Sequence, residues 1–315
     1  MIKMKISFGK MISTILCAAM IAAFARPVCT EAMSATEKDT LAMGMDVAKY
    51  QGTIDWQKAY NAGVRFAFIK AGSKNGVDPY FAENMRGAKA AGIKTGVYLY
   101  SYATSVAEAY SEAVLMISWL DEYEIDFPVV YDVEDPSMRG IDRAEIGKMI
   151  ETFCNLISDA GYFPMIYSYR NFFRSTIGDV PYPKWVAQCG DSLSCDLTDV
   201  MFWQQSSESY INGIEPRVDV DYQLVDLSDK IVRDGFAERN GRTMCFSGYR
   251  RLTGWAEFNG YRYYMDPNGY VQKGMFLDDN GATYYLTETD GHAATGVITI
   301  GGKAYEFDAQ GKMKK

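Results

Sequence analysis

Between residues 40 and 227, short runs of β-branched and aromatic residues alternate with stretches whose apolar positions recur every three or four residues. The short runs predict strands at 44–48, 64–70, 93–100, 127–133, 163–168, 184–188, 200–205 and 218–222. The longer stretches predict helices at 55–61, 79–90, 105–121 and 142–160, and none between the last three strands. Strand–helix alternation is typical of a parallel sheet, so the pattern predicts an α/β fold, an irregular TIM-like β/α barrel of five β/α units plus three further strands.

The pattern changes after this region. Residues 248–315 hold 11 of the 28 glycines and 8 of the 23 tyrosines, in units of about twenty residues that begin at Thr253-Gly254, Lys273-Gly274 and Thr295-Gly296. Each unit has a glycine turn, an aromatic strand and a second turn of Asp or Asn with Gly, which predicts a small β-hairpin repeat domain whose hairpins stack to form a core. The polar residues 228–247 are expected to be a linker.

The N-terminus has the features of a targeting segment. Lys3, Lys5 and Lys10 precede an apolar run, residues 11–25, that ends in Ala23-Phe24-Ala25. This pattern predicts a signal peptide over residues 1–25 and a secreted protein without a membrane segment, with an uncleaved N-terminal anchor as the alternative.

Export would place the remaining cysteines in an oxidising compartment. Cys189 and Cys195 flank a short polar stretch and are expected to form a local disulfide, with two isolated thiols as the alternative. Cys154 belongs to an i, i+3, i+4, i+7 apolar stripe with Ile150, Phe153 and Ile157, so a core position in a helix that ends near Gly161 is expected.

Charge and histidine content exclude several classes of function. The formal net charge of −8 argues against a nucleic-acid partner, because phosphate binding needs clustered Lys and Arg. The single histidine, His292, lies near the C-terminus, so the barrel can form neither a Ser-His-Asp triad nor a His-based zinc site. Carboxylates therefore remain as the acid–base groups, and no metal or organic cofactor is expected.

Five of those carboxylates should meet at one end of the barrel. Asp46 ends the first strand, Asp132 and Glu134 end the fourth, and Asp219 and Asp221 lie in the last. Asp132 and Glu134 are two residues apart, so both side chains point to the same face of the strand. Crowded carboxylates raise the pKa of one another, and a protonated acid beside an ionised one is the equipment of glycoside hydrolysis.

Aromatic residues in or beside the strands could stack on sugar rings. With Asp221, these candidate substrate contacts are Tyr98, Tyr100, Tyr131, Tyr167, Trp185 and Trp203.

The barrel region also carries a series of short motifs in order. They are Met45-Asp46-Val47, Tyr50-Gln51-Gly52, Ile54-Asp55-Trp56, residues 66–71, Asp78-Pro79-Tyr80-Phe81, residues 87–92, Gly96-Val97-Tyr98, Asp132-Val133-Glu134, residues 166–169, Trp203-Gln204 and Val218-Asp219-Val220-Asp221. Across residues 43–227 this series resembles the glycoside hydrolase family 25 lysozymes, muramidases that cut the β-1,4 bond between N-acetylmuramic acid and N-acetylglucosamine in peptidoglycan.

The resemblance implies a role for each acid. Glu134 would be the general acid, Asp132 would orient the 2-acetamido group or stabilise positive charge at the anomeric carbon, and Asp46 and Asp219 would be the remaining catalytic carboxylates. The sequence departs from the family pattern twice, with Ala48-Lys49-Tyr50 in place of Ser-His-Trp and Asp221 in place of a frequent Asn. A covalent intermediate, acetamido participation and direct displacement by water all remain open.

The alternatives to a muramidase are a chitinase-like hydrolase and a non-catalytic glycan-binding protein. A chitinase-like hydrolase would need acids at the positions of Phe127 and Val130, which the sequence lacks. A non-catalytic glycan-binding protein would not need both Asp132 and Glu134.

The tail resembles the cell-wall-binding repeats of the choline-binding and glucan-binding type. Trp255 matches the Gly-Trp that begins each unit in that family, whereas Met275 and Val297 stand in the later units. Trp255, Tyr264 and Tyr285 are the candidate contacts to a wall ligand, although the hairpins could also only pack on each other. The expected partners are peptidoglycan strands and a wall polymer, and the expected form is a monomer associated with the cell wall.

Overall fold

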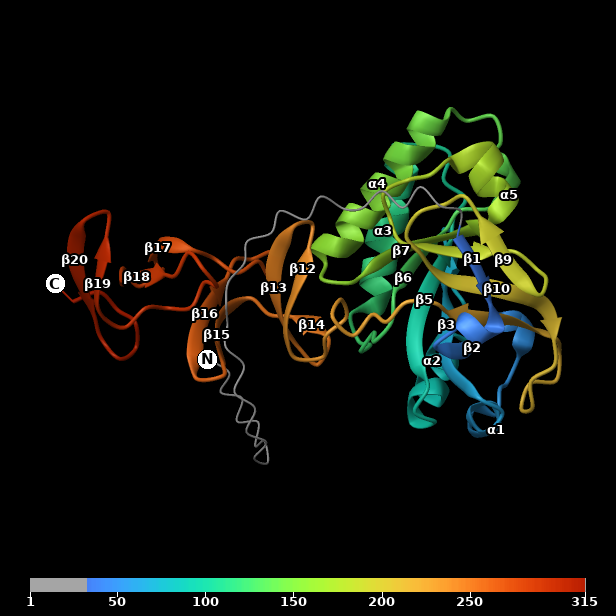
Figure 1. Ribbon diagram of the computed structural model, residues 1–315, viewed down its shortest axis with the longest axis horizontal. Coiled ribbons are helices and arrows are strands. Elements are labelled where there is room, and N and C mark those ends of the chain that lie inside the picture. The colour runs from blue at the N-terminus through green and yellow to red at the C-terminus, as the bar shows by residue number, and fades with distance from the viewer. Residues whose placement is uncertain (1–32, 315) are drawn as a thin grey trace. The chain divides into compact units, whose positions relative to one another are not determined.

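The structure is a computed structural model that describes residues 33–314, so the predicted signal peptide lies outside the described residues. The described residues divide into two compact units, one of residues 33–252 with 267–270 and one of residues 253–266 with 271–314. Figure 1 shows the strands and helices of each unit. No helix among the described residues has the length and apolar character needed to cross a membrane.

The first unit is built on a closed barrel of eight strands, as predicted. Its strands, in spatial order, are β2 (Ala42–Val47), β11 (Val218–Gln223), β10 (Val200–Ser209), β8 (Lys184–Ala187), β7 (Pro164–Tyr169), β6 (Val129–Asp132), β5 (Lys94–Tyr100) and β3 (Val64–Ser73). Pairing of β2 with β3 closes the ring. Outside the barrel, β4 (Gly76–Val77) extends β3, and β1 (Met33–Thr36) pairs with β9 (Ser192–Cys195).

The strand β11 runs against both of its neighbours, β10 and β2, whereas the other barrel strands run parallel. In a parallel barrel the functional edge is formed by the carboxyl ends of the strands. The antiparallel direction brings the beginning of β11 to that edge, and its register places Asp219 opposite Asp46.

Helices follow the first five barrel strands along the chain, and the four that were predicted lie within two residues of their predicted bounds. They are α1 (Trp56–Asn61), α2 (Phe81–Ala90), α3 (Val106–Leu120), α4 (Arg143–Asp159) and the short α5 (Arg170–Phe172), which continues as the π-helical turn η4 (Phe173–Ile177). Three-residue 3-10 turns form η1 (Glu37–Asp39), η2 (Lys49–Gln51) and η3 (Pro136–Met138). The side chains of Asp55, Ser105 and Asp142 accept hydrogen bonds from the first turns of α1, α3 and α4, which explains where these helices begin.

The apolar stripe predicted on α4 is confirmed. Ile150, Phe153, Cys154 and Ile157 are all buried between this helix and the barrel. Gly161 follows the C-cap with a φ of +98°, a conformation that favours glycine and ends the helix there.

The barrel interior is filled by aromatic rings. Phe66 stacks on Phe127 with ring centroids 5.4 Å apart, and Phe68 stacks on Trp185 at 4.4 Å. Gly44 faces the same interior, where a Cβ atom would come within 2.4 Å of the Phe66 ring. The barrel therefore has a packed floor, and polar side chains on the same face of the strands lie above it.

The predicted disulfide between Cys189 and Cys195 is wrong, because Cys189 is a free, exposed cysteine. Instead of a loop that returns on itself, residues 192–195 form the extended strand β9, which pairs with β1. The pairing of β9 with β1, a segment distant in sequence, fixes the course of these residues, which the local spacing of the two cysteines does not reveal.

Residues 228–247 are not an extended linker. They contain β12 (Gly235–Arg239) and β13 (Arg242–Ser247), which form a three-stranded sheet with β14 (Arg250–Arg251). Ala237, Met244 and Phe246 are buried in it, and the buried Arg239 donates to the carbonyl oxygen of Gly161 at 3.1 Å. These few apolar residues alternate with polar ones, as is typical of a strand. The segment was expected to be a linker because charged residues dominate its composition. The domain boundaries themselves stay a prediction.

The second unit consists of three successive β-hairpins, as the repeat predicts. They are β15 (Gly254–Phe258) with β16 (Tyr261–Met265), β17 (Gly274–Leu277) with β18 (Thr283–Leu286), and β19 (Gly296–Ile300) with β20 (Lys303–Phe307). Gly254, Gly274 and Gly296 begin the hairpins with φ angles of +71°, +84° and +78°. The same left-handed conformation at each start explains why the repeat is led by glycine.

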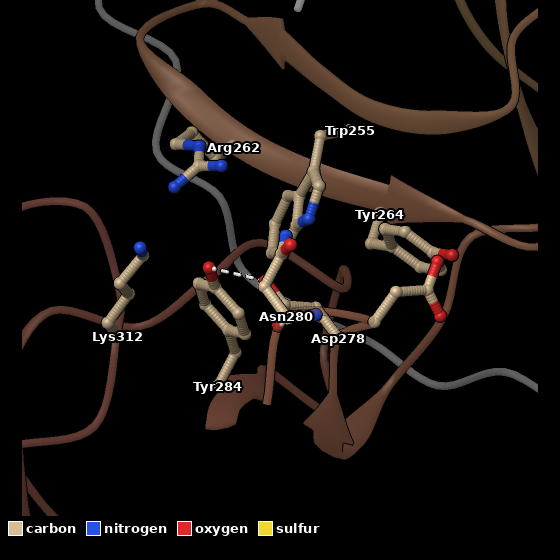
Figure 2. Close-up of a pocket in the computed structure, with 8 residues that line it drawn as sticks. Trp255, Arg262, Tyr264, Asp278, Asn280, Tyr284 and Lys312 are labelled. Atoms are coloured by element: carbon tan, nitrogen blue, oxygen red, sulfur yellow. Dashed lines mark hydrogen bonds between the residues drawn. The ribbon is translucent and has the colours of Figure 1, made fainter. Parts of the chain in front are cut away.

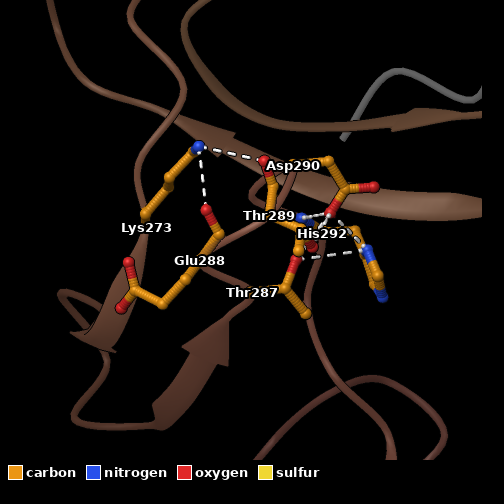
Figure 3. Close-up of polar contacts among 6 residues, drawn as sticks. All are labelled: Lys273, Thr287, Glu288, Thr289, Asp290 and His292. Atoms are coloured by element: carbon orange, nitrogen blue, oxygen red, sulfur yellow. Dashed lines mark hydrogen bonds and ion pairs between the residues drawn. The ribbon is translucent and has the colours of Figure 1, made fainter. Parts of the chain in front are cut away.

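The histidine of this unit takes part in hydrogen bonds that stabilise a turn. The loop after β18 is held by a network in which His292 Nδ1 lies 2.7 Å from Asp290 Oδ1 and the Thr287 hydroxyl donates to the same oxygen at 2.6 Å (Figure 3). Lys273 donates to the carbonyl oxygens of Glu288 and Thr289 in this loop at 3.0 and 3.1 Å. The network fixes the connection between the second and third hairpins.

A buried lysine in the barrel gives a test of the fold. Lys184 is fully buried, and its Nζ donates to the carbonyl oxygens of Val180, Tyr182 and Thr198 and pairs with Asp179 at 2.9 Å. We expect Lys184→Met to lower the free energy of unfolding by about 3 kcal/mol, because the carbonyls and the carboxylate lose their donor. Urea denaturation measures the change.

The matched control is Lys148→Met. Lys148 is exposed and pairs loosely with Glu145 at 3.5 Å, and exposed pairs contribute little to stability. Equal losses in the two variants would contradict this assignment of Lys184.

Candidate active site

The five predicted carboxylates are brought together at the mouth of the barrel. Asp46 lies near the end of β2, Asp132 is the last residue of β6, and Glu134 follows two residues later. Asp219 and Asp221 are the second and fourth of the six residues of β11. Among the described residues, no group of three or more His, Cys, Asp or Glu side chains has the geometry to hold a metal ion.

Asp46, Asp219 and Asp221 form one half of the site. Asp46 accepts a hydrogen bond from Gln204 Nε2 at 2.6 Å, and Asp219 lies opposite it in the register of β2 and β11. Burial, followed by the charges of Asp221 and Asp219, raises the pKa of Asp46 well above its usual range. Both causes favour the protonated form of this carboxyl group.

Asp132 and Glu134 form the other half. Asp132 is 4% exposed, and burial followed by the neighbouring Glu134 raises its pKa well above the usual range. Burial raises the pKa of Glu134 to about 7, and the positive charge of Lys70 opposes this rise. In the part of the chain that the structure describes, Asp132 Oδ1 and Glu134 Oε2 are buried without a hydrogen-bond partner. These two oxygens therefore have unused hydrogen-bonding capacity within the site.

Lys70 is a site residue that the sequence did not single out. It follows Phe66 and Phe68 at intervals of two along β3, which places it on the interior face above those rings. Its Nζ lies 4.7 Å from the centroid of the Tyr100 ring and 5.7 Å from that of Tyr98. The alternation of side chains along a strand could have identified Lys70 from the sequence. A lysine that continues the series of inward-facing phenylalanines at the end of the strand must reach the mouth.

Gln204 was missed for the same reason. It follows the interior Phe202 by two residues on β10, accepts a hydrogen bond from the Tyr167 hydroxyl at 2.8 Å, and donates to Asp46. This chain of hydrogen bonds fixes both the tyrosine and the carboxyl group.

Three of the predicted aromatic contacts lie at the mouth. Tyr98, Tyr100 and Tyr167 are close enough to the catalytic carboxylates for those negative charges to raise the pKa of each hydroxyl further, after burial as the main cause. The Tyr100 hydroxyl also donates to Asp135 at 3.1 Å. These rings line the space into which a substrate would enter.

The predictions for Tyr131 and Trp203 as substrate contacts are wrong. Tyr131 precedes the inward Asp132 and points outward, where it stacks on Phe153 with centroids 4.0 Å apart and donates to Glu112 at 2.8 Å. Trp203 precedes the inward Gln204, belongs to the same outer core, and donates to the carbonyl oxygen of Gln188 at 2.7 Å. Strand alternation therefore buries both rings away from the mouth.

Trp185 has a different position from the one predicted. It is 1% exposed in the barrel interior and its Nε1 donates to Asp221 Oδ1 at 2.8 Å. The ring is covered by its neighbours, so Trp185 holds a carboxyl group of the site rather than a sugar.

In the hairpin unit, Trp255 and Tyr264 line a pocket together with Tyr284 (Figure 2). Tyr285, the third predicted wall contact, is not among the lining residues. It pairs with Met275 on the opposite face of its hairpin, and its neighbour Tyr284 takes the place in the pocket.

Two families match this sequence. Residues 45–214, more than half of the chain, match glycosyl hydrolases family 25, and residues 252–296 match the choline-binding repeat. The first match spans the barrel strands that carry Asp46, Asp132 and the following Glu134.

Individual proteins are also similar to this chain in sequence or in structure. The uncharacterized protein YegX of Escherichia coli O157:H7 is 36% identical over 188 residues, which cover 56% of this chain and 67% of YegX. The autolytic lysozyme of Clostridium acetobutylicum is 28% identical over 183 residues, 56% of this chain and 54% of that enzyme. The structure of the modular autolysin LytC from Streptococcus pneumoniae is similar with a TM-score of 0.52 and 26% identity, over 57% of this chain and 46% of LytC.

The closed barrel, the paired carboxyl groups at its mouth and the family match over that same region agree. The chain therefore belongs to family 25 of the glycosyl hydrolases and is an enzyme of the lysozyme type.

Proposed function

We propose that the barrel cleaves the β-1,4 bond between N-acetylmuramic acid and N-acetylglucosamine in peptidoglycan, with Glu134 as the general acid. The observation that carries this proposal is the state of Glu134, a half-buried carboxyl group with a pKa of about 7 and a buried oxygen without a partner. Such a group is protonated at mildly acidic pH and can give its proton to a leaving sugar oxygen. A non-catalytic binding protein would have no use for that arrangement.

The other carboxyl groups have supporting roles in this proposal. Asp132 lies two residues before Glu134, on the same face of the chain. It orients the 2-acetamido group or stabilises positive charge at the anomeric carbon. Asp46 and Asp219 complete the catalytic set, and Asp221, held by the Trp185 indole, lies two residues from Asp219 on the same strand.

The glycan strand lies across the mouth in this proposal. Tyr98, Tyr100 and Tyr167 contact the sugars nearest to the cleaved bond. More exposed tyrosines follow the mouth ends of three strands, namely Tyr50 after β2, Tyr169 at the end of β7 and Tyr210 after β10, with exposed fractions of 72%, 51% and 75%. Exposed rings at these positions could stack on sugars farther along the strand.

The tail and the N-terminus define where the enzyme acts. We infer that residues 1–25 are a signal peptide, that the barrel spans residues 40–227, and that the repeats over residues 248–315 attach a secreted, monomeric enzyme to a polymer of the cell wall. The match of residues 252–296 to the choline-binding repeat supports the attachment.

The first test compares the protein with Glu134→Gln on purified peptidoglycan. We expect the variant to lose about 10²- to 10⁴-fold in kcat, because its amide cannot donate the proton. Mass spectrometry after borohydride reduction should show new reducing ends on N-acetylmuramic acid for the unchanged protein only.

The control is Glu122→Gln, at an exposed carboxylate in the turn between α3 and the start of β6, which is at the end of that strand opposite to the mouth. Reduced N-acetylglucosamine ends would overturn the proposed bond, and equal activity of Glu134→Gln would overturn the proposed acid.

The pH dependence tests Lys70. Because Glu134 must be protonated to act, kcat/KM should fall as pH rises through about 7. Lys70 holds that pKa down, so Lys70→Met should move the fall to higher pH, whereas Lys70→Arg should keep it in place. Unmoved pH profiles in both variants would contradict a direct charge effect of Lys70 on the acid.

Because the carboxyl groups are crowded, replacing one of them by an amide is expected to increase the stability of the fold. Burial, followed by Asp219, raises the pKa of Asp221 in the folded state, so the stability that its proton provides is lost as pH rises from about 4 through the folded pKa. Asp221→Asn removes this dependence and should raise the free energy of unfolding at pH 7.5 by on the order of 1–2 kcal/mol, with a smaller gain at pH 4.5.

Urea denaturation at the two pH values measures this gain. The control is Asp226→Asn, since the exposed Asp226 accepts hydrogen bonds from Ser228 that lower its pKa. A gain in the control, or none in Asp221→Asn, would contradict the predicted effect of burial.

A further inference from the structure

The first two hairpins of the tail bring four aromatic rings together. Trp255 lies 5.3 Å from Tyr264, 5.8 Å from Phe276 and 4.6 Å from Tyr284, measured between ring centroids, and Tyr264 lies 4.1 Å from Phe276. Clusters of this kind bind quaternary ammonium groups through the negative faces of their rings. The rings alone would therefore favour a cationic ligand.

A cation of the chain itself already lies on this cluster. Arg262 is two residues before Tyr264 on β16, so its side chain leaves the hairpin on the same face as Trp255 and Tyr264. Its guanidinium carbon lies 4.3 Å from the Trp255 ring centroid and 6.0 Å from that of Tyr284. A second cation on the same ring would meet its positive charge at close range.

Arg262 is held in that position. Its Nη1 donates to the carbonyl oxygen of Gln310 at 2.5 Å, in the turn after the third hairpin, and its own carbonyl oxygen accepts from the backbone of Ala293. The guanidinium thus has one fixed partner besides the ring. Displacing it would break this bond, so a bound cation would have to compete with a preformed interaction.

The rest of the pocket is polar and electrically balanced. Its rim is formed by Asp278, Asp279, Asn280 and Lys312, and the cavity has a volume of about 270 Å³ (Figure 2). Two acids and the two cations Arg262 and Lys312 cancel in formal charge. The volume is slightly below the range of about 300–1,000 Å³ that is usual for drug-sized ligands, which suits a single sugar ring.

We propose that Arg262 is a built-in cation that excludes quaternary ammonium ligands such as choline, and that the pocket binds a neutral sugar unit of a wall glycan. The free ring surface of Tyr264 packs on the sugar, and the carboxylate, amide and ammonium groups of the rim hydrogen-bond to its hydroxyls. This inference rests on the proposed role of the tail in wall attachment and names its ligand class.

The test is isothermal titration of the full chain with choline chloride, and separately with the neutral probes maltotriose and N,N′-diacetylchitobiose. The unchanged protein should bind a neutral probe and show no choline binding. Arg262→Gln keeps an amide donor for the Gln310 carbonyl but removes the charge, and it should bind choline at least about tenfold more tightly than the parent. Arg262→Lys keeps a cation and should stay without choline binding.

Trp255→Ala separates the tail from the barrel, because sugar binding in the pocket should be lost in this variant while binding at the barrel mouth persists. Choline binding by the parent, or no gain of choline binding in Arg262→Gln, would overturn the role of Arg262. Failure of both neutral probes to show any binding that depends on Trp255 would overturn the ligand class. Hydrolysis of soluble peptidoglycan fragments, measured in parallel, reports on the barrel alone and separates these failures from a failure of the proposed activity.

Discussion

The reversed direction of β11 is the constraint on which the active site depends. This strand closes the barrel between β10 and β2, and because it runs against both, its first residues lie at the mouth beside the last residues of β2. Asp219 and Asp221 thereby join Asp46 across one pair of strands. A parallel last strand would have carried these acids toward the packed aromatic floor, where no bound sugar could reach them.

Closure of the barrel also encloses the carboxyl groups, and this burial determines how strongly they hold protons. Phe66, Phe68 and Trp185 fill the barrel below the acids and exclude water from that side. Carboxyl groups placed above such a floor lose solvation, so their proton affinities rise before any substrate binds. Lys70 enters from β3 and limits this rise on one side of the mouth, which leaves Glu134 able to exchange its proton near neutral pH. The positive charge of Lys70 therefore acts on Glu134 against the effect of burial, which raises the pKa of the neighbouring carboxyl groups as well.

Much of this fold could be predicted from the sequence, and the limits have identifiable physical causes. The helix α4 and its strands are specified by local apolar periodicity, so their bounds were predicted closely, and the acids were found because they end such runs. The inward or outward direction of a side chain needs the register of the strand as well, which is why Tyr131 was assigned to the mouth although Asp132 beside it occupies the inner face. The strand β9 depends on its pairing with β1, distant in sequence, and no local pattern around Cys189 reports that pairing.

The direction of β11 also gives the two ends of the barrel different roles. Since this strand starts at the mouth, it finishes at the opposite end, and the chain continues from Gln223 into β12 on that side. The sheet of β12, β13 and β14, which belongs to the same compact unit as the barrel, therefore follows in the chain from the end opposite to the mouth. Gene fusion or loss downstream of this point can exchange the attached modules without rebuilding any loop of the catalytic rim, so the architecture is suited to acquiring new wall specificities while the hydrolase is kept.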